Sequence, residues 1–192
     1  MDRDFEVYAL ARKGSENKLP SGCNVIIGNA LDRTSYIDKI SPCETFIHLV
    51  GVNNPAPSKK QAFEEIDLVS IDEAVHAVKN TTIKHFIYVS VAHPAPIMKD
   101  YIRVRLRGES LIRENGLYAT ILKPWYILGP GHKWPYMLLP FLKVLEYVPY
   151  TRDAAMRLCL VNINSILNAL VFAVQNPANG IRYMRAPQIR KF

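Results

Sequence analysis

The sequence has 192 residues, of which 49% are hydrophobic and 21% are charged, and its formal net charge is +7. This is the balance of an ordinary globular protein, so the length predicts one domain with a sizeable core. No apolar run approaches the roughly 20 residues of a membrane span, and the scattered basic residues exclude a nucleic-acid-binding arm.

The cysteines and the start of the chain bear on its compartment. Cys23, Cys43 and Cys159 are odd in number, widely spaced and without a zinc or redox motif, so we interpret them as reduced thiols of a cytoplasmic protein. The charged start, Met1–Asp4, leads directly into a strand-like run and is unlike a secretory signal. The positive charge admits acidic ligands such as nucleotides, and it also fits a basic surface with no partner.

The first half of the chain alternates apolar strands with helices. Apolar and β-branched residues predict strands over Phe5–Ala11, Asn24–Ile27 and Thr45–Val50, and the last of these is apolar enough to be buried on both faces, as in parallel sheets. Helices are expected over Asp32–Ile40, capped by its first residue, and over residues 61–80, where apolar residues recur at helical spacing.

The second half continues this alternation and then loosens after Pro124. Gly116 stands where a left-handed helix cap belongs. The stretch 134–150, rich in aromatics and prolines, could line a substrate pocket, contact a partner or build irregular core. The expected elements are a strand over Ile83–Ser90, a helix over Met98–Asn115, a strand over Tyr118–Leu122 and a helix over Ser165–Gln175 capped by Asn164. Alternating strands and helices imply a parallel sheet with helices on both faces.

One stretch carries candidate groups for proton transfer. Tyr101 and Arg105 lie four residues apart on a predicted helix and therefore on one face. Ser90 ends the preceding strand, so a tyrosine, a cation and a hydroxyl are expected near each other. A plainer explanation is that Arg105 pairs with Glu109, which is also four residues away.

Several segments, taken in order, resemble one known family. They are Val7–Arg12, Ile27–Asp32, Phe46–Gly51, Lys84–Ser90, Tyr101–Arg105 and Gly116–Pro124 followed by Gly129–Gly131. Their order and spacing are similar to the atypical and extended short-chain dehydrogenase/reductase superfamily, in its NmrA-like and complex-I-subunit-like branch. The resemblance implies an α/β fold, a doubly wound, parallel-sheet, Rossmann-like domain over residues 1–192, in which 125–192 form a small substrate-binding or cap-like part.

The sequence departs from this family at its start. The family begins with a strand and a G-x-x-G-x-x-G turn that brings backbone close to the cofactor pyrophosphate. Gly14 and Gly22 are too far apart for that turn. The resemblance places Met1 late in the family's first helix, so we expect the first strand and the glycine turn to be missing, through a start placed too late or a truncated or variant product. The neighbours of that central strand should then expose their edges or rearrange.

The resemblance implies a nicotinamide dinucleotide cofactor. Arg12, after the first strand, stands where the family binds the 2′-phosphate of NADP, so NADP is expected rather than NAD. Lys13 is the secondary candidate for this contact. The alternative is that Arg12 is a solvated surface arginine. Leu49 and Val50 are equally explained as core. The remaining implied cofactor positions are Asn29 and Ala30 at the adenine, Leu49, Val50 and Gly51 at the ribose, and Ser90, Tyr101, Arg105 and Pro124 nearer the nicotinamide.

The implied catalytic residues are Tyr101, Arg105 and Ser90. The family uses Tyr-x-x-x-Lys, in which the tyrosine transfers a proton and the lysine lowers its pKa and holds the ribose. Arginine in place of lysine is not a conservative change. The family's active hydroxyl usually lies two residues after Ser90, where this chain has Ala92. His93 is an alternative acid or base.

The function implied is therefore an NAD(P)-binding, short-chain dehydrogenase-like protein, working as an NADP-dependent oxidoreductase or an epimerase on an unknown small molecule. The alternatives are a non-catalytic nucleotide-binding regulator or assembly subunit, which Ala92 and Arg105 favour, and a chain that binds no cofactor. No metal, nucleic-acid partner or membrane span is expected, and a homo-oligomer is left open.

Overall fold

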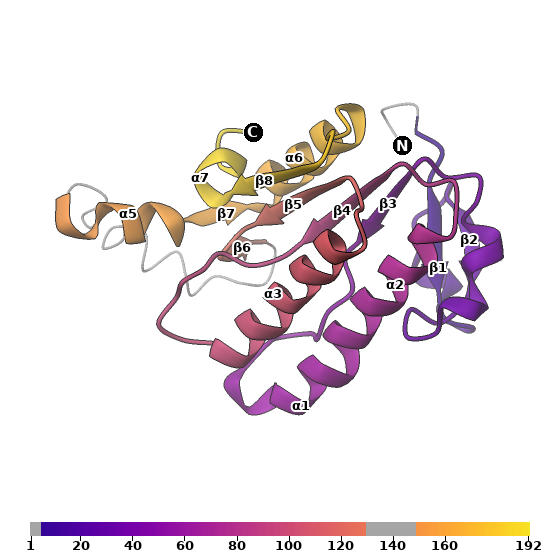
Figure 1. The fold of residues 1–192 in the computed structure, drawn as a ribbon, viewed down its shortest axis with the longest axis horizontal. Helices are drawn as coiled ribbons and strands as arrows, with labels where there is room; N and C mark the ends of the chain where they lie inside the picture. The colour runs from indigo at the N-terminus through magenta and orange to yellow at the C-terminus, as the bar shows by residue number, and fades with distance from the viewer. Residues whose placement is uncertain (1–4, 130–148) are drawn as a thin grey trace.

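The computed structural model describes residues 5–129 and 149–192, and all of its paired strands run parallel (Figure 1). The main sheet has the order β3-β4-β5-β8, while β1 pairs with β2 and β6 pairs with β7. The strands are β1 (Tyr8–Ala11), β2 (Asn24–Ile27), β3 (Thr45–His48), β4 (His85–Val89), β5 (Ala119–Lys123), β6 (Tyr126–Leu128), β7 (Leu160–Asn162) and β8 (Ile181–Arg185). The residues 130–148, which include most of the aromatic stretch singled out above, lie outside the described part.

Helices lie on both faces of the main sheet, as Figure 1 shows for α2 and α3 on one side and α6 and α7 on the other. They are α1 (Lys60–Ala62), a π-helical turn (Phe63–Leu68), α2 (Val69–Lys79), α3 (Lys99–Glu114), α5 (Pro149–Arg157), α6 (Ile163–Gln175) and α7 (Ala186–Ile189). This layered α/β arrangement of parallel strands confirms the predicted Rossmann-like fold. Within the described ranges, no helix is both long and apolar enough to cross a membrane.

Two buried clusters hold the layers together. On the side of α2 and α3, Ile71 and Ile112 pack with Phe86 and with Ile26 of the smaller sheet. On the other side, Ile166 of α6 packs with the apolar residues of β4 and β5 that point towards it. Because both faces of the central strands are covered, β5 is buried at every position, including its polar residues Thr120 and Lys123.

The strands β1 and β3 confirm the expectation of exposed edges. Each of them pairs on one side only, β1 with β2 and β3 with β4, so the sheet is divided between them. No strand lies between the two in the part of the chain that the structure describes. Apolar side chains beside the division are open to solvent, including Ile47 at 40% and Leu49 at 62% exposure.

The helix predicted over Asp32–Ile40 is wrong. The segment forms two 3-10 turns, Arg33–Ser35 and Ile37–Lys39, with Asp32 capping the first by accepting a hydrogen bond from the Thr34 backbone at 3.0 Å. Tyr36 separates the turns at φ −140° and ψ −13°, which breaks a helix, and its side chain is buried in the core. Burial of this tyrosine outweighs the local helical pattern.

Two helix ends test the capping predictions. Gly116 follows α3 at φ +68°, so the predicted left-handed residue is confirmed. The cap of α6 is Asn162, whose side chain accepts a hydrogen bond from the Ser165 backbone at 2.8 Å, and the prediction of Asn164 is wrong. The helix starts earlier because Ile163 follows directly on β7.

Candidate cofactor and active site

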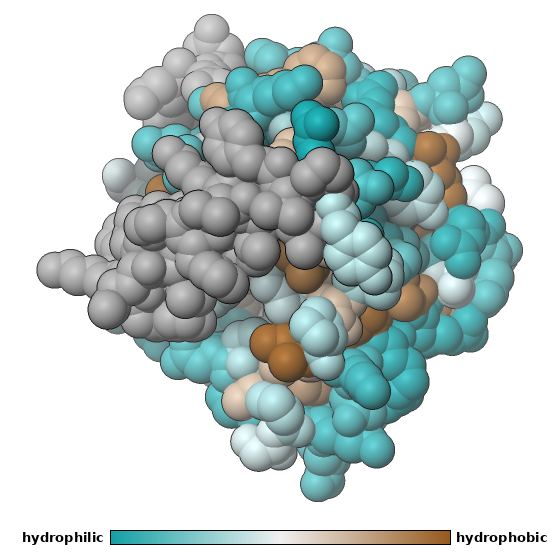
Figure 2. Space-filling model, turned by 90° about the vertical axis from the view of Figure 1, so that its left-hand side faces the viewer, coloured by the Kyte–Doolittle hydropathy of each residue, from teal (hydrophilic) through white to brown (hydrophobic). Residues whose placement is uncertain are grey.

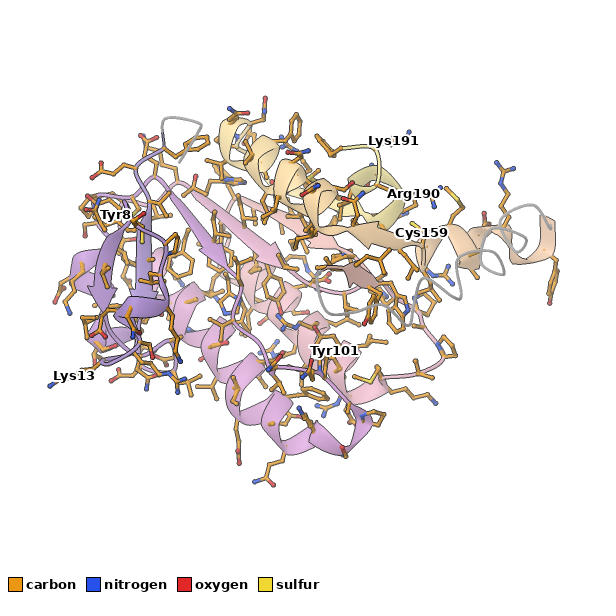
Figure 3. All side chains as sticks on the ribbon, turned by 180° about the vertical axis from the view of Figure 1, so that it is seen from behind. Tyr8, Lys13, Tyr101, Cys159, Arg190 and Lys191 are labelled. Atoms are coloured by element: carbon orange, nitrogen blue, oxygen red, sulfur yellow. The ribbon has the colours of Figure 1, made fainter. Side chains whose placement is uncertain are left out.

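The predicted catalytic residues lie at the carboxyl ends of the central strands, where Tyr101 and Arg105 contact each other and Ser90 belongs to a separate network. Gly51 follows β3, Ser90 follows β4, and Tyr101 and Arg105 reach the same end from α3, where Figure 3 labels Tyr101. Figure 2 views this end of the molecule, where a few hydrophobic residues show among hydrophilic ones and beside the residues drawn in grey. The carboxyl edge of a parallel sheet is where such folds bind ligands.

The Arg105 guanidinium is buried at this edge, where both of its terminal nitrogens donate to protein oxygens and its Nε has no hydrogen-bond partner among the described residues. Its Nη2 donates to Asp67 Oδ1 at 2.6 Å and to the Val50 carbonyl at 3.4 Å, and its Nη1 donates to the Val89 carbonyl at 3.2 Å. The two charged side chains are 7% and 0% exposed. Burial raises the pKa of Asp67, while Arg105 and the Val52 amide act in the opposite direction.

The close approach expected at Gly51 is made by Arg105 itself. A Cβ added at Gly51 would lie 2.3 Å from Arg105 Nη2, so a side chain there would displace the guanidinium. Next to it, the Val52 amide donates to Asp67 Oδ2 at 2.9 Å. Asp67 belongs to the π-helical turn, a local distortion that is frequent at functional sites.

Tyr101 lies against this cation, as the four-residue spacing predicts. The Arg105 Cζ is 5.2 Å from the centre of the Tyr101 ring and 5.8 Å from that of the buried Tyr88 ring. Phe63 packs edge-on to Tyr101 with ring centres 5.2 Å apart. Aromatic packing and a cation–π contact therefore fix the ring of Tyr101 at the site.

Ser90 belongs to a second buried polar network. Its hydroxyl donates to Glu109 Oε1 at 2.6 Å, and Lys123 Nζ lies 2.7 Å and 2.9 Å from the two oxygens of the same carboxylate. Lys123 Nζ also donates to His93 Nε2 at 2.7 Å, which requires a neutral imidazole with its proton on Nδ1. Burial and the neighbouring Lys123 lower the pKa of His93.

These contacts test the predicted pairing of Arg105 with Glu109. It pairs with Asp67, and Glu109 pairs with Lys123, so the predicted ion pair between Arg105 and Glu109 is wrong. Asp67 was not predicted as part of the site, and Glu109 was named only as a partner of Arg105. A signal for Asp67 exists in the sequence, because it stands four residues after Phe63 and three before Ser70, on the apolar face of its helix.

The predicted cofactor positions lie at the ends of β1, β2 and β3. Arg12 is exposed directly after β1, and the Asn29 side chain accepts a hydrogen bond from the Leu31 backbone at 3.1 Å. The Pro124 carbonyl accepts one from the Ala92 backbone at 2.9 Å, which ties the ends of β4 and β5 together. Of the other predicted positions, Ala30 is half-buried after β2. After β3, Leu49 is exposed, Val50 is half-buried and Gly51 is exposed. Among the described residues, no group of three or more His, Cys, Asp or Glu side chains could hold a metal ion.

No protein-family model matches this sequence, and no curated protein is significantly similar to it. Solved structures do match its fold. The enzyme WbmH of Bordetella bronchiseptica, in complex with NAD+, is 15% identical, with a TM-score of 0.67 over 96% of this chain and 68% of its own. The UDP-glucuronic acid 4-epimerase of Bacillus cereus, in complex with NAD, is 17% identical, with a TM-score of 0.61 over 89% and 62%.

A third match is a short-chain dehydrogenase/reductase superfamily protein from Agrobacterium tumefaciens with bound NAD, which is 14% identical, with a TM-score of 0.62 over 86% of this chain and 66% of its own. The chain thus spans between 62% and 68% of the length of these three proteins. At such low identity, the likeness concerns the fold. Like these three proteins, the chain has a Rossmann-like α/β fold.

Proposed function

We propose that this chain binds a nicotinamide dinucleotide between the carboxyl ends of β1 and β3. The observation that carries the proposal is the strand order. From β1 the chain winds outward to β2, and from β3 it winds the other way through β4 and β5. In open α/β sheets, ligands bind where the winding direction reverses.

The residues at these strand ends fit a dinucleotide in chemical terms. Arg12 offers an exposed guanidinium directly after β1, suited to the 2′-phosphate of NADP. Gly51, after β3, is exposed, so its backbone can meet an approaching ribose, while the space where a side chain would lie is filled by Arg105. The neighbours that match this fold carry NAD in their crystals, and Arg12 is the reason for proposing NADP here.

The proposed chemistry is that of an oxidoreductase or epimerase in the cytoplasm. The bound cofactor would accept hydride from the substrate or donate hydride to it. Tyr101 would hold or move the proton of a substrate hydroxyl or carbonyl oxygen. Arg105, held by Asp67, would keep a positive charge beside that tyrosine. Residues 125–192 would contribute to the substrate side of the site.

A second candidate, a nucleotide-binding regulator or assembly subunit without turnover, is favoured by the hydrogen bonds of the site. The Ser90 proton is donated to Glu109, and the Arg105 guanidinium donates to Asp67 and two carbonyls. Ala92 brings no hydroxyl and is buried. Such a protein would keep the cofactor site and lack the free donors that catalysis uses.

The proposals are separated by titrating the purified chain with NADPH and with NADH, read by nicotinamide fluorescence. We expect tighter binding of NADPH, and Arg12→Glu should remove that preference because it places a carboxylate beside the 2′-phosphate. Arg107→Glu, an exposed change on α3, is the matched control. If the chain binds neither NADPH nor NADH, the proposal is refuted. Binding without turnover, unchanged by Tyr101→Phe, would select the second candidate.

A further inference from the structure

His93 lies at the carboxyl edge of the main sheet, where its ring is held by a buried cation. It follows β4, is half-buried, and its Nε2 accepts a hydrogen bond from Lys123 Nζ at 2.7 Å. Lys123 is the last residue of β5, and beside it the Ala92 amide donates to the Pro124 carbonyl at 2.9 Å. The joined ends of β4 and β5 therefore bring the imidazole and the ammonium together.

The Lys123 ammonium has no proton left for a ligand. It contacts the two oxygens of the Glu109 carboxylate at 2.7 Å and 2.9 Å, and its remaining contact goes to His93. An ammonium has three donors, so all of them are used. The Glu109 side chain is 3% exposed and also accepts the Ser90 hydroxyl proton at 2.6 Å. A buried carboxylate thus holds Lys123 in place, and Lys123 orients the ring of His93.

The contact with Lys123 also decides what His93 can offer to a ligand. Because Nε2 accepts the ammonium proton, the neutral ring carries its own proton on Nδ1. Burial lowers the pKa of His93 most, and three nearby cations act in the same direction: Lys123, Arg157 and Arg185. Glu109 acts in the opposite direction. Nδ1 donates to none of the residues that the structure describes. His93 therefore presents a neutral N–H donor and has no nitrogen available as a base.

Two further cations lie near this donor. Arg157 of α5 donates through Nε to the carbonyl of Pro94, the residue after His93, at 3.2 Å. Arg185 is exposed at the end of β8, where it is in register with Lys123. Within the described ranges, neither arginine forms an ion pair. An N–H donor beside cations without a paired carboxylate favours an anionic oxygen as its acceptor, because such charge-assisted hydrogen bonds are the stronger ones.

We propose that His93 binds an anionic oxygen of the substrate, from a carboxylate or a phosphate group, by donating its Nδ1–H, with Arg157 and Arg185 supplying positive charge. Lys123 is a positioning residue, because it acts only through the imidazole that it holds. The inference rests on the proposed function only in calling the ligand a substrate. The site lies at the ends of β4, β5 and β8, whereas the dinucleotide is proposed at the ends of β1 and β3.

Side-chain NMR of His93 in the ¹⁵N-labelled chain tests the proposal in the absence of cofactor. At neutral pH the ring should be neutral, with its proton on Nδ1. Inorganic phosphate and acetate are the probes, and the tighter of the two identifies the anionic group preferred. Either should shift the Nδ1 signal in a saturable way. His76 on α2 is the internal control, and its ring signals should not change at constant pH.

Variants measured by titration calorimetry with phosphate separate the donor from the ring. His93→Phe keeps a ring without a donor and should weaken binding at least about tenfold, the scale of one hydrogen bond to a charged group. His93→Asn should retain part of the affinity, because its amide supplies an N–H close to the position of Nδ1. Arg157→Gln should weaken binding, whereas the matched change Arg152→Gln, at an exposed position of the same helix, should not.

Three results would overturn the proposal. They are a His93 ring that is protonated at neutral pH or carries its proton on Nε2, probe binding that His93→Phe leaves unchanged, and no saturable shift with either probe. Failure of the cofactor proposal is seen separately, as a chain that does not bind NADPH while its His93 still responds to phosphate.

Discussion

Replacement of Arg105 by methionine removes the charge at the centre of the site while keeping a long side chain. In the folded protein this leaves Asp67, 0% exposed, without its cation. The Val52 amide remains as a hydrogen-bond donor to that carboxylate. The change also opens the space beside Gly51 that the guanidinium fills.

The expected loss of stability is large. Breaking a buried ion pair by removing one partner costs about 3–5 kcal/mol, because it leaves an uncompensated buried charge. That is a substantial share of the roughly 5–15 kcal/mol by which domains are stable. The double variant Arg105→Met/Asp67→Leu should recover most of the loss, since it removes both charges and restores apolar contact.

Helix α3 provides the control. Arg107 pairs with Glu114 at 2.8 Å, but these side chains are 50% and 55% exposed, so Arg107→Met should cost at most about 1 kcal/mol. Urea unfolding followed by circular dichroism measures both variants. Equal losses in the Arg105 and Arg107 variants would refute the reasoning that burial makes the Asp67 pair decisive.

The Arg105→Met variant also has a characteristic pH dependence. Burial already raises the pKa of Asp67, and removal of Arg105 raises it further. Its folded pKa then exceeds the unfolded value of about 3.9, so the folded state binds the proton more tightly. Stability is therefore lost as pH rises through these values, and the deficit relative to wild type should shrink on acidification.

Two further predictions concern single residues. Gly116→Ala should lower the free energy of unfolding by about 1 kcal/mol, because the backbone there has a φ of +68°. Gly129→Ala, which has open space and no positive φ, should leave the urea midpoint unchanged. Equal effects of the two substitutions would contradict the left-handed assignment of Gly116. Burial, aided by Arg105, lowers the pKa of His48 to about 3. Since the unfolded value is about 6.5, the stability it contributes is present above that pH and is lost as pH falls towards 3, and an NMR titration of His48 near 6.5 would contradict it.

The sequence predicts most of the strands because their apolar runs are local signals. β4 and β5 are buried on both faces, so their composition alone identifies them. The segment Asp32–Ile40 fails because the burial of Tyr36 depends on residues distant in sequence. Local pattern cannot reveal such tertiary contacts.

The candidate site was predictable only in part for the same reason. The spacing of Tyr101 and Arg105 places them together on α3, as found. The partner of Arg105 lies 38 residues away in the chain, whereas Glu109 is the nearer and wrong choice. Which carboxylate meets the guanidinium depends on how α3 packs against the π-helical turn, and no sequence spacing contains that information.

The most direct test of the proposed cofactor site is a map of amide chemical shifts in the uniformly labelled chain as NADPH is added. The account predicts that the largest changes fall at Arg12, at Asn29 and Ala30, and at Leu49–Gly51, which follow β1, β2 and β3. Changes confined to other parts of the chain, or no changes at saturating NADPH, would contradict dinucleotide binding between the carboxyl ends of β1 and β3.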